Sequence, residues 1–192
     1  MNKSTKKPEI HITLVEGLIE LDKWLEKEGL YLDLKIIGGS ALHLHNIEID
    51  RATTDIDIAT AITDKEILDQ IARIGRKEGL EETWIEFSDV AIPTEANFES
   101  HSLFNPLRNI SGKFLDIESL FITKIAAYYD RLHRQITDVD DIESMIKSGE
   151  TLTTQLIQAG MDFIRKTRKY PLDEDRMTQV QKDLNSLLTS TD

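Results

Sequence analysis

The chain has 192 residues, of which 40% are hydrophobic, and a formal net charge of −12 at pH 7. This length suits one domain, or one domain with a helical extension, and the negative charge argues against broad, nonspecific binding to nucleic acid. The sequence has no cysteine, which excludes disulfides and cysteine-based zinc sites. No stretch is long and apolar enough to cross a membrane, and residues 1–8 are basic without the apolar segment of a secretory signal. We therefore expect a cytoplasmic protein with a disordered N-terminal tail.

The first half of the chain alternates between helical and strand-like patterns of hydrophobic residues. In chain order, the patterns predict a helix over 10–28, a strand over 32–37, a short helix over 40–45, a strand over 55–61, a helix over 63–78, a strand over 84–90, a loop over 93–109 and a strand over 113–117. Gly29 and Gly79 follow two of these helices, where glycine commonly ends a helix. Ser40 is a candidate N-cap of the short helix, and Thr63 begins a capping-box pattern that ends at Glu66.

The second half is predicted to be helical. The expected helices cover 118–132, 137–148, 151–169 and 173–188. The fold class predicted from the whole pattern is α/β (α+β), a small mixed sheet flanked by helices. Residues 9–117 would form the α/β core, and residues 118–192 a helical C-terminal region packed on it.

Two short motifs combine features that suit phosphate and metal chemistry. Gly38-Gly39-Ser40 follows an apolar strand and opens a helix, where backbone N–H groups can bind a phosphate. Asp55 and Asp57 lie at positions i and i+2 of the next strand, so their side chains are expected on one side with Cα atoms roughly 6–7 Å apart. Two carboxylates at this spacing can share divalent cations. Each motif alone is weak, because glycine turns and solvated acids at strand ends are both common.

The two motifs together, with their flanks, resemble the nucleotidyltransferase superfamily. The residues that match are the glycine turn continued by Ala41-Leu42-His43-Leu44-His45, and Arg51-Ala-Thr-Thr-Asp55-Ile-Asp57-Ile58. This pair is similar to the minimal bacterial nucleotidyltransferases, among them the AbiEii-type proteins known as toxins of type IV toxin–antitoxin pairs. A second block supports the resemblance: Lys124-Ile-Ala-Ala on a helix, then Arg131, then Asp138-Val-Asp-Asp141, with Thr137 where Lys or Arg is usual. The resemblance covers roughly residues 36–146.

The resemblance implies a nucleotidyltransferase-like fold and a metal-dependent transfer of NMP from an NTP to an acceptor such as RNA, a protein side chain or a small molecule. It implies that Asp55 and Asp57 hold Mg²⁺ or Mn²⁺ and serve catalysis. It also implies that a glycine turn with two cationic side chains binds the nucleotide; these residues are Gly38, Gly39, Ser40, Lys124 and Arg131. In a toxin–antitoxin setting, an antitoxin would be a partner. The oligomeric state does not follow from the sequence.

A third acid on a neighbouring strand normally helps to activate the nucleophile in such enzymes. Glu86, in Trp84-Ile-Glu-Phe87, is the first candidate for this catalytic role, and Asp116 is the second. The alternative for Glu86 is an ordinary solvent-facing strand residue. For Lys124 it is a surface lysine, and for Arg51 a structural role in the loop before Asp55.

Other charged residues have simpler explanations. The basic segments around Arg165–Lys169 and Arg131/Arg134 are interpreted as solvated helix faces. His43 and His45 diverge on a helix and make a poor metal pair, so at least one of them is expected to pack or to form a hydrogen bond. His133 is expected on an exposed helix face.

Three other functions compete with an active transferase. The first is a non-catalytic member of the same fold that binds a nucleotide or a partner protein. The second is a phosphatase of the haloacid dehalogenase type, which the polar residues before Asp55 and the alanine at position 59 disfavour. The third is a glycosyltransferase with an Asp-x-Asp motif, which would leave the Gly-Gly-Ser turn unexplained.

Overall fold

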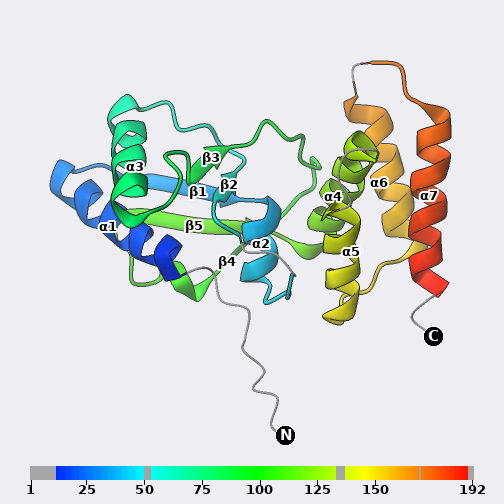
Figure 1. Ribbon diagram of the computed structural model, residues 1–192, viewed down its shortest axis with the longest axis horizontal. Coiled ribbons are helices and arrows are strands. Elements are labelled where there is room, and N and C mark those ends of the chain that lie inside the picture. The colour runs from blue at the N-terminus through cyan, green and yellow to red at the C-terminus, as the bar shows by residue number, and fades with distance from the viewer. Residues whose placement is uncertain (1–11, 50–52, 133–136, 169, 190–192) are drawn as a thin grey trace, which may run out of the picture. The chain divides into compact units, whose positions relative to one another are not determined.

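The computed structural model describes residues 12–49, 53–132, 137–168 and 170–189 (Figure 1). It divides into two compact units: residues 1–90 with 97–115, and residues 91–96 with 116–192. Its helices are α1 (Ile12–Glu28), α2 (Gly38–Leu44), α3 (Lys65–Glu78), α4 (Ile117–Arg131), α5 (Thr137–Lys147), α6 (Thr154–Thr167) and α7 (Glu174–Thr189). Its strands are β1 (Leu32–Ile36), β2 (Ile56–Ile58), β3 (Ile85–Phe87), β4 (Phe98–Ser100) and β5 (Ile110–Leu115). These elements confirm the predicted α+β class; the predicted tail over residues 1–8 lies outside the described residues.

The first unit is built on one mixed five-stranded sheet in the order β3-β2-β1-β5-β4. β1 is antiparallel to β2 and parallel to β5, while β3 is parallel to β2 and β4 is antiparallel to β5. β1 and β5, the first and last strands in the sequence of this unit, are therefore neighbours in the sheet. This order places β2 and β3 together on one side of β1.

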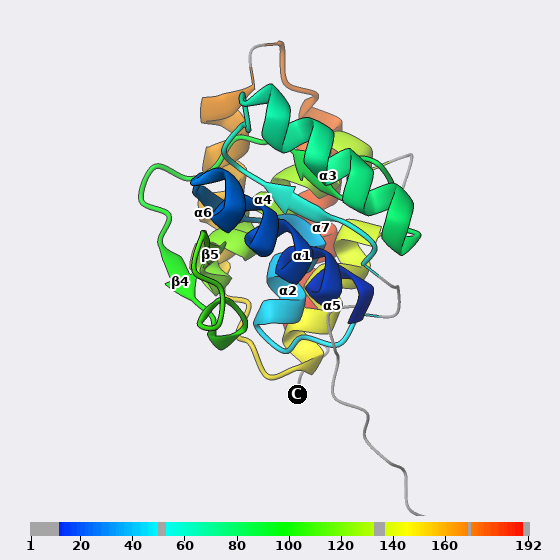
Figure 2. The ribbon, with the colours of Figure 1, turned by 90° about the vertical axis from the view of Figure 1, so that its left-hand side faces the viewer.

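One face of the sheet supplies the core of the first unit. The residues of β1 alternate between buried and exposed, with Leu32, Leu34 and Ile36 buried, as expected for a strand with one covered face. Figure 2 shows α1 and α3 in front of the sheet, and the two helices contact each other. The fully buried Trp84 packs on this layer, and its indole N–H donates a 2.8 Å hydrogen bond to the carbonyl of Ile71.

Three local expectations need correction. The N-cap of α3 is Asp64, whose carboxylate accepts hydrogen bonds from two backbone N–H groups, so the helix begins one residue later than the Thr63 pattern predicted. Ser40 does not cap α2, because the helix already begins at Gly38. The predicted strand over 113–117 is β5, which runs from Ile110, and the predicted loop over 93–109 contains β4 and a 3₁₀ turn over Ser102–Phe104.

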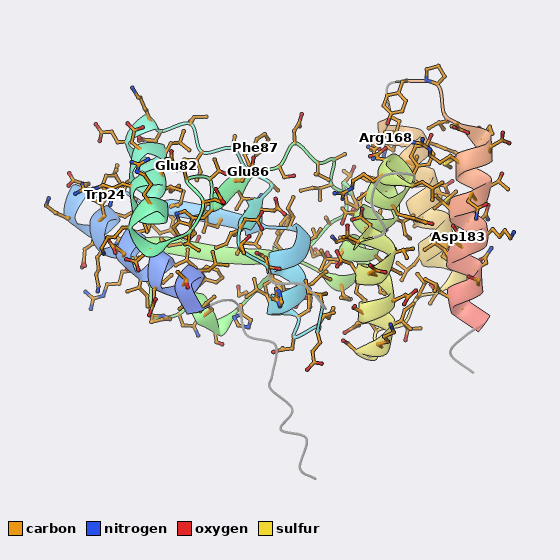
Figure 3. The ribbon with its side chains drawn as sticks, in the orientation of Figure 1. Trp24, Glu82, Glu86, Phe87, Arg168 and Asp183 are labelled. Carbon is orange, nitrogen blue, oxygen red and sulfur yellow. The ribbon has the colours of Figure 1, made fainter. Side chains whose placement is uncertain are left out.

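Besides residues 91–96, the described part of the second unit is formed by α4 to α7 and the segments that connect them. α4 contacts α5, α6 and α7, and Gly160 on α6 lies against Ile125 on α4, where a larger residue would collide. The Tyr128 hydroxyl donates a 2.7 Å hydrogen bond to Asp183 on α7. Figure 3 labels Asp183 on that helix. Throughout the described residues, no helix has the combination of length and apolar character that crossing a membrane requires.

Candidate functional site

The turn between β1 and α2 is built around Gly38 and Asp57. Gly38 has a φ of +65°, in the left-handed region that favours glycine. A Cβ atom at this position would lie 3.2 Å from the carboxyl carbon of Asp57 and closer still to Oδ2. The backbone N–H of Ile37 donates a 2.9 Å hydrogen bond to the carbonyl of Asp57. Position 38 therefore requires glycine both for its backbone conformation and for the space that the Asp57 carboxylate occupies.

Ser40 connects the same turn to the beginning of β2. Its buried hydroxyl donates a 2.6 Å hydrogen bond to the backbone carbonyl of Asp55. The N–H groups of Gly38, Gly39 and Ser40 precede the first intrahelical hydrogen bond of α2, from Ala41 to Ile37. The glycine turn and the Asp-x-Asp motif, which are 15 residues apart in the sequence, thus form one structural element.

The two aspartates and Glu86 lie on adjacent strands of the sheet. Asp57 is the middle residue of β2, and Asp55 directly precedes that strand; both are half-buried. β2 and β3 are parallel, and Asp57 is paired in register with Glu86. Register partners point to the same face of a sheet from Cα atoms about 4.8 Å apart. Figure 3 labels Glu86 on β3, where it is exposed.

These carboxylates do not form a preformed three-residue metal cage. Within the described ranges, no group of three histidine, aspartate or glutamate side chains is placed to hold a metal ion. Asp116, the second candidate for the third acid, accepts hydrogen bonds from the N–H and hydroxyl of Ser119 at 3.0 Å and 2.8 Å and so caps α4. Glu86 is therefore the acid that the sheet places next to Asp57.

Lys124 and Arg131 belong to a cluster of charged side chains on α4 and α5. The ammonium of Lys124 donates a 2.6 Å hydrogen bond to Asp141 and lies 3.6 Å from Asp138, with all three side chains at least nine-tenths buried. Arg131 donates a 2.9 Å hydrogen bond to Asp138 from a side chain that is 44% exposed. Lys124 is therefore not a surface lysine. The role of both cations towards a nucleotide stays a prediction.

Burial dominates the electrostatics of Asp138. Desolvation raises the pKa of this carboxyl above its usual value, although Lys124 and Arg131 act in the opposite direction. Its Oδ2 atom is buried without a hydrogen-bond partner among the described residues. The nearby cations and hydrogen bonds therefore offset only part of the cost of burying the charged form of Asp138.

The other basic residues considered above either have a partner in the structure or lie outside the described ranges. Arg168 forms a partly buried ion pair with Asp130, and Arg165 pairs with Asp162 at 3.0 Å. The imidazole Nε2 of His45 lies 2.9 Å from the carbonyl of Leu115, as expected for a packed, hydrogen-bonded histidine. The residues outside the described ranges are Arg51, His133, Arg134 and Lys169.

Two exposed lysines share the sheet face of Asp57 and Glu86, and they were not among the residues expected at the site. Lys35 on β1 is paired in register with Lys113 on β5. Lys35 occupies a polar position of the alternating strand β1, which is visible in the sequence. The adjacency of the two lysines depends on a pairing between segments 78 residues apart, which no local pattern reveals.

No family model matches the sequence, and no curated protein or solved structure matches it. We therefore infer the function from the geometry of this chain.

Proposed function

We propose that this protein is a metal-dependent nucleotidyltransferase that moves NMP from an NTP to a hydroxyl group of an acceptor and releases pyrophosphate. The observation that supports this most is the contact between the Gly38 turn and the Asp57 carboxylate. It brings backbone N–H groups suited to phosphate next to carboxylates suited to a divalent cation. The register pairing of Asp57 with Glu86 adds a third acid beside them.

The donor set fits Mg²⁺ or Mn²⁺. Mg²⁺ typically keeps several waters and is bound by one or two carboxylates together with substrate phosphates, rather than by an all-protein cage. Asp55 and Asp57 would supply those carboxylates, so a three-carboxylate group is not required before the nucleotide binds. The bound cation would neutralise phosphate charge and help to orient the reacting oxygens.

The chain's own residues would divide the remaining work. The N–H groups of Gly39 and Ser40 would bind phosphate oxygens, while the Ser40 hydroxyl holds the start of β2 in place through the Asp55 carbonyl. Glu86 would accept the proton of the attacking hydroxyl, because its exposed carboxylate makes no hydrogen bond or ion pair with the other described residues. The acceptor itself, whether RNA, a protein side chain or a small molecule, is not assigned by these contacts.

The test is labelling of acceptors in a cell lysate with radiolabelled NTPs and Mg²⁺ or Mn²⁺. We expect wild-type protein to label an acceptor and Asp57→Asn to reduce the rate on the order of 10²–10³-fold, because a cation contact is worth several kcal/mol in the transition state. Glu99→Gln is the matched control, since Glu99 is an exposed acid on edge strand β4. Equal labelling by Asp57→Asn and wild type would reject the proposal.

A non-catalytic nucleotide-binding protein is the second candidate, because Glu86, the acid paired in register with Asp57, is exposed and no hydrogen bond or ion pair with another described residue fixes its carboxylate. Under this alternative, calorimetry would detect binding of Mg²⁺-ATP to wild-type protein, and Asp57→Asn would weaken it. No acceptor would be labelled with any of the four NTPs. If the protein is a transferase, the Glu86→Gln variant should abolish transfer and leave nucleotide binding within about twofold of wild type. This outcome would separate catalysis from nucleotide binding.

A further inference from the structure

The sheet face that bears Asp57 and Glu86 also bears the lysine pair, Lys35 and Lys113. The residues of β1 alternate between buried and exposed, so Lys35, at an exposed position, points to the face opposite the buried Leu34 and Ile36. Lys113 is its register partner on the parallel strand β5 and is also exposed. The ammonium of Lys35 lies 5.4 Å from the centre of the Phe98 ring on β4, so it extends across β5, the strand of Lys113.

Among the described residues, the lysine pair has no carboxylate partner. Neither lysine forms an ion pair within the described part of the chain, and like charges at adjacent strand positions repel each other. Asp33, the neighbouring acid on the same face of β1, accepts a hydrogen bond from the hydroxyl of Ser111. Acidic residues outnumber basic ones by 35 to 23 in this chain. Two adjacent lysines without an acid between them are therefore a local excess of positive charge that a bound anion would compensate.

The position of the lysine pair relates it to the carboxylates. Strand order places β2 and β5 on either side of β1, so Asp57 and Lys113 are separated by two strand spacings, roughly 10 Å across the sheet. Ser100 is paired with Lys113 on the antiparallel strand β4 and offers a hydroxyl on the same face. A ligand held at Asp57 and Glu86 could thus extend over β1 to reach two ammonium groups and one hydroxyl.

We propose that Lys35 and Lys113 form a subsite for a phosphate group of the ligand that binds at Asp57. This inference rests on the proposed function for the identity of that ligand, which is either the NTP or a phosphate-bearing acceptor. Ammonium groups bind phosphate as compact point charges with several donors each. The aromatic ring of Phe98 restricts the position of the Lys35 side chain beside the subsite.

The test measures binding of inorganic tripolyphosphate by calorimetry at low ionic strength in the presence of EDTA. We expect the double variant Lys35→Gln/Lys113→Gln to bind at least about tenfold more weakly than wild type, because two charge-assisted contacts are lost. The matched control is Lys23→Gln/Lys27→Gln, which removes the same charge from α1 on the other side of the sheet. The midpoint of thermal unfolding of the double variant should equal or exceed that of wild type, since a repulsive pair is removed. Equal binding by the two double variants, or no binding by wild type, would overturn the subsite.

Two further titrations distinguish the sources of the phosphate. Weaker binding of Mg²⁺-ATP by the lysine variant assigns the subsite to the NTP. Unchanged Mg²⁺-ATP binding, together with weaker binding of a short single-stranded RNA, assigns it to a phosphate-bearing acceptor. Because the tripolyphosphate measurement needs neither metal nor turnover, it can succeed when acceptor labelling fails, and it can fail when labelling succeeds.

Discussion

The molecule has two groups of charged side chains with similar chemistry and opposite surroundings. In the first unit, Asp55 and Asp57 are half-buried and Glu86 is exposed, next to a glycine turn. In the second unit, two aspartates and Lys124 are buried together on α4 and α5. The first group leaves negative charge accessible, whereas the second neutralises most of its own charge.

Burial separates these two groups of carboxylates: Asp138 and Asp141 are almost completely buried, whereas Asp55 and Asp57 are half-buried and Glu86 is exposed. Buried charges persist only when they are paired and hydrogen-bonded, and removing one partner is costly. Accessible carboxylates beside backbone N–H groups can instead exchange water for a cation and a phosphate. We therefore expect substitutions in the second unit to change stability, and substitutions in the first unit to change ligand binding.

The largest stability effect is expected for Lys124→Met. Methionine keeps most of the aliphatic volume but leaves Asp138 and Asp141 buried without their shared cation, which should cost about 3–5 kcal/mol of unfolding free energy. Urea denaturation followed by circular dichroism measures this loss. Arg131→Met is the control in the same cluster, and its half-exposed side chain predicts a loss of less than about 1 kcal/mol. A stable Lys124→Met protein that no longer binds ATP would instead assign Lys124 to the nucleotide.

An intermediate effect is expected for Gly38→Ala, which tests the turn in the first unit. Alanine in the left-handed conformation costs about 1–2 kcal/mol, and its Cβ would also collide with the Asp57 carboxylate. Gly79→Ala is the matched control, because Gly79 has a φ of +74° with no atom within 4 Å of the added Cβ. Gly38→Ala should lose more stability in urea than Gly79→Ala, because only its Cβ meets another residue, and only Gly38→Ala should weaken Mg²⁺-ATP binding in calorimetry. Equal ATP affinities would show that the Gly38–Asp57 contact does not shape the site.

The helices and strands could be predicted largely from local patterns, because each has its own periodicity and end signals. α3 illustrates this: its N-cap lies one residue later than predicted, and Gly79 ends it as expected. The N-cap is Asp64 and not the predicted Thr63. Both residues are good N-caps, and the sequence does not decide between them. β5 begins earlier than predicted because Gly112 interrupts its apolar pattern; in the structure the Phe104 ring packs against that glycine.

The candidate site was predictable in its residues and not in its contacts. The glycine turn and Asp-x-Asp motif identify Gly38 and Asp57, but their contact depends on the antiparallel pairing of β1 with β2. The lysine pair was missed for the same reason, since its members belong to strands that pair across 78 residues. The partners of Lys124 were partly visible as the Asp138-Val-Asp-Asp141 segment. The burial of Lys124 could not be predicted, because a lysine on an apolar helix face fits both a ligand site and an internal ion pair.

The smallest effect concerns the pH dependence of stability in the second unit. Burial raises the pKa of Asp138 above its usual value of 3.8, so the folded protein takes up this proton at a higher pH than the unfolded chain. The stability that this group contributes is fully present below 3.8 and is lost as the pH rises through its folded-state pKa. Acidification from about pH 7 to about pH 4.5 should therefore favour wild type relative to Asp138→Asn, which cannot titrate there. Thermal unfolding of both proteins across this range should show a difference in midpoint that shifts towards wild type as the pH falls. A shift in the other direction would mean that Lys124 and Arg131 outweigh burial, and that the cluster stabilises Asp138 as a carboxylate.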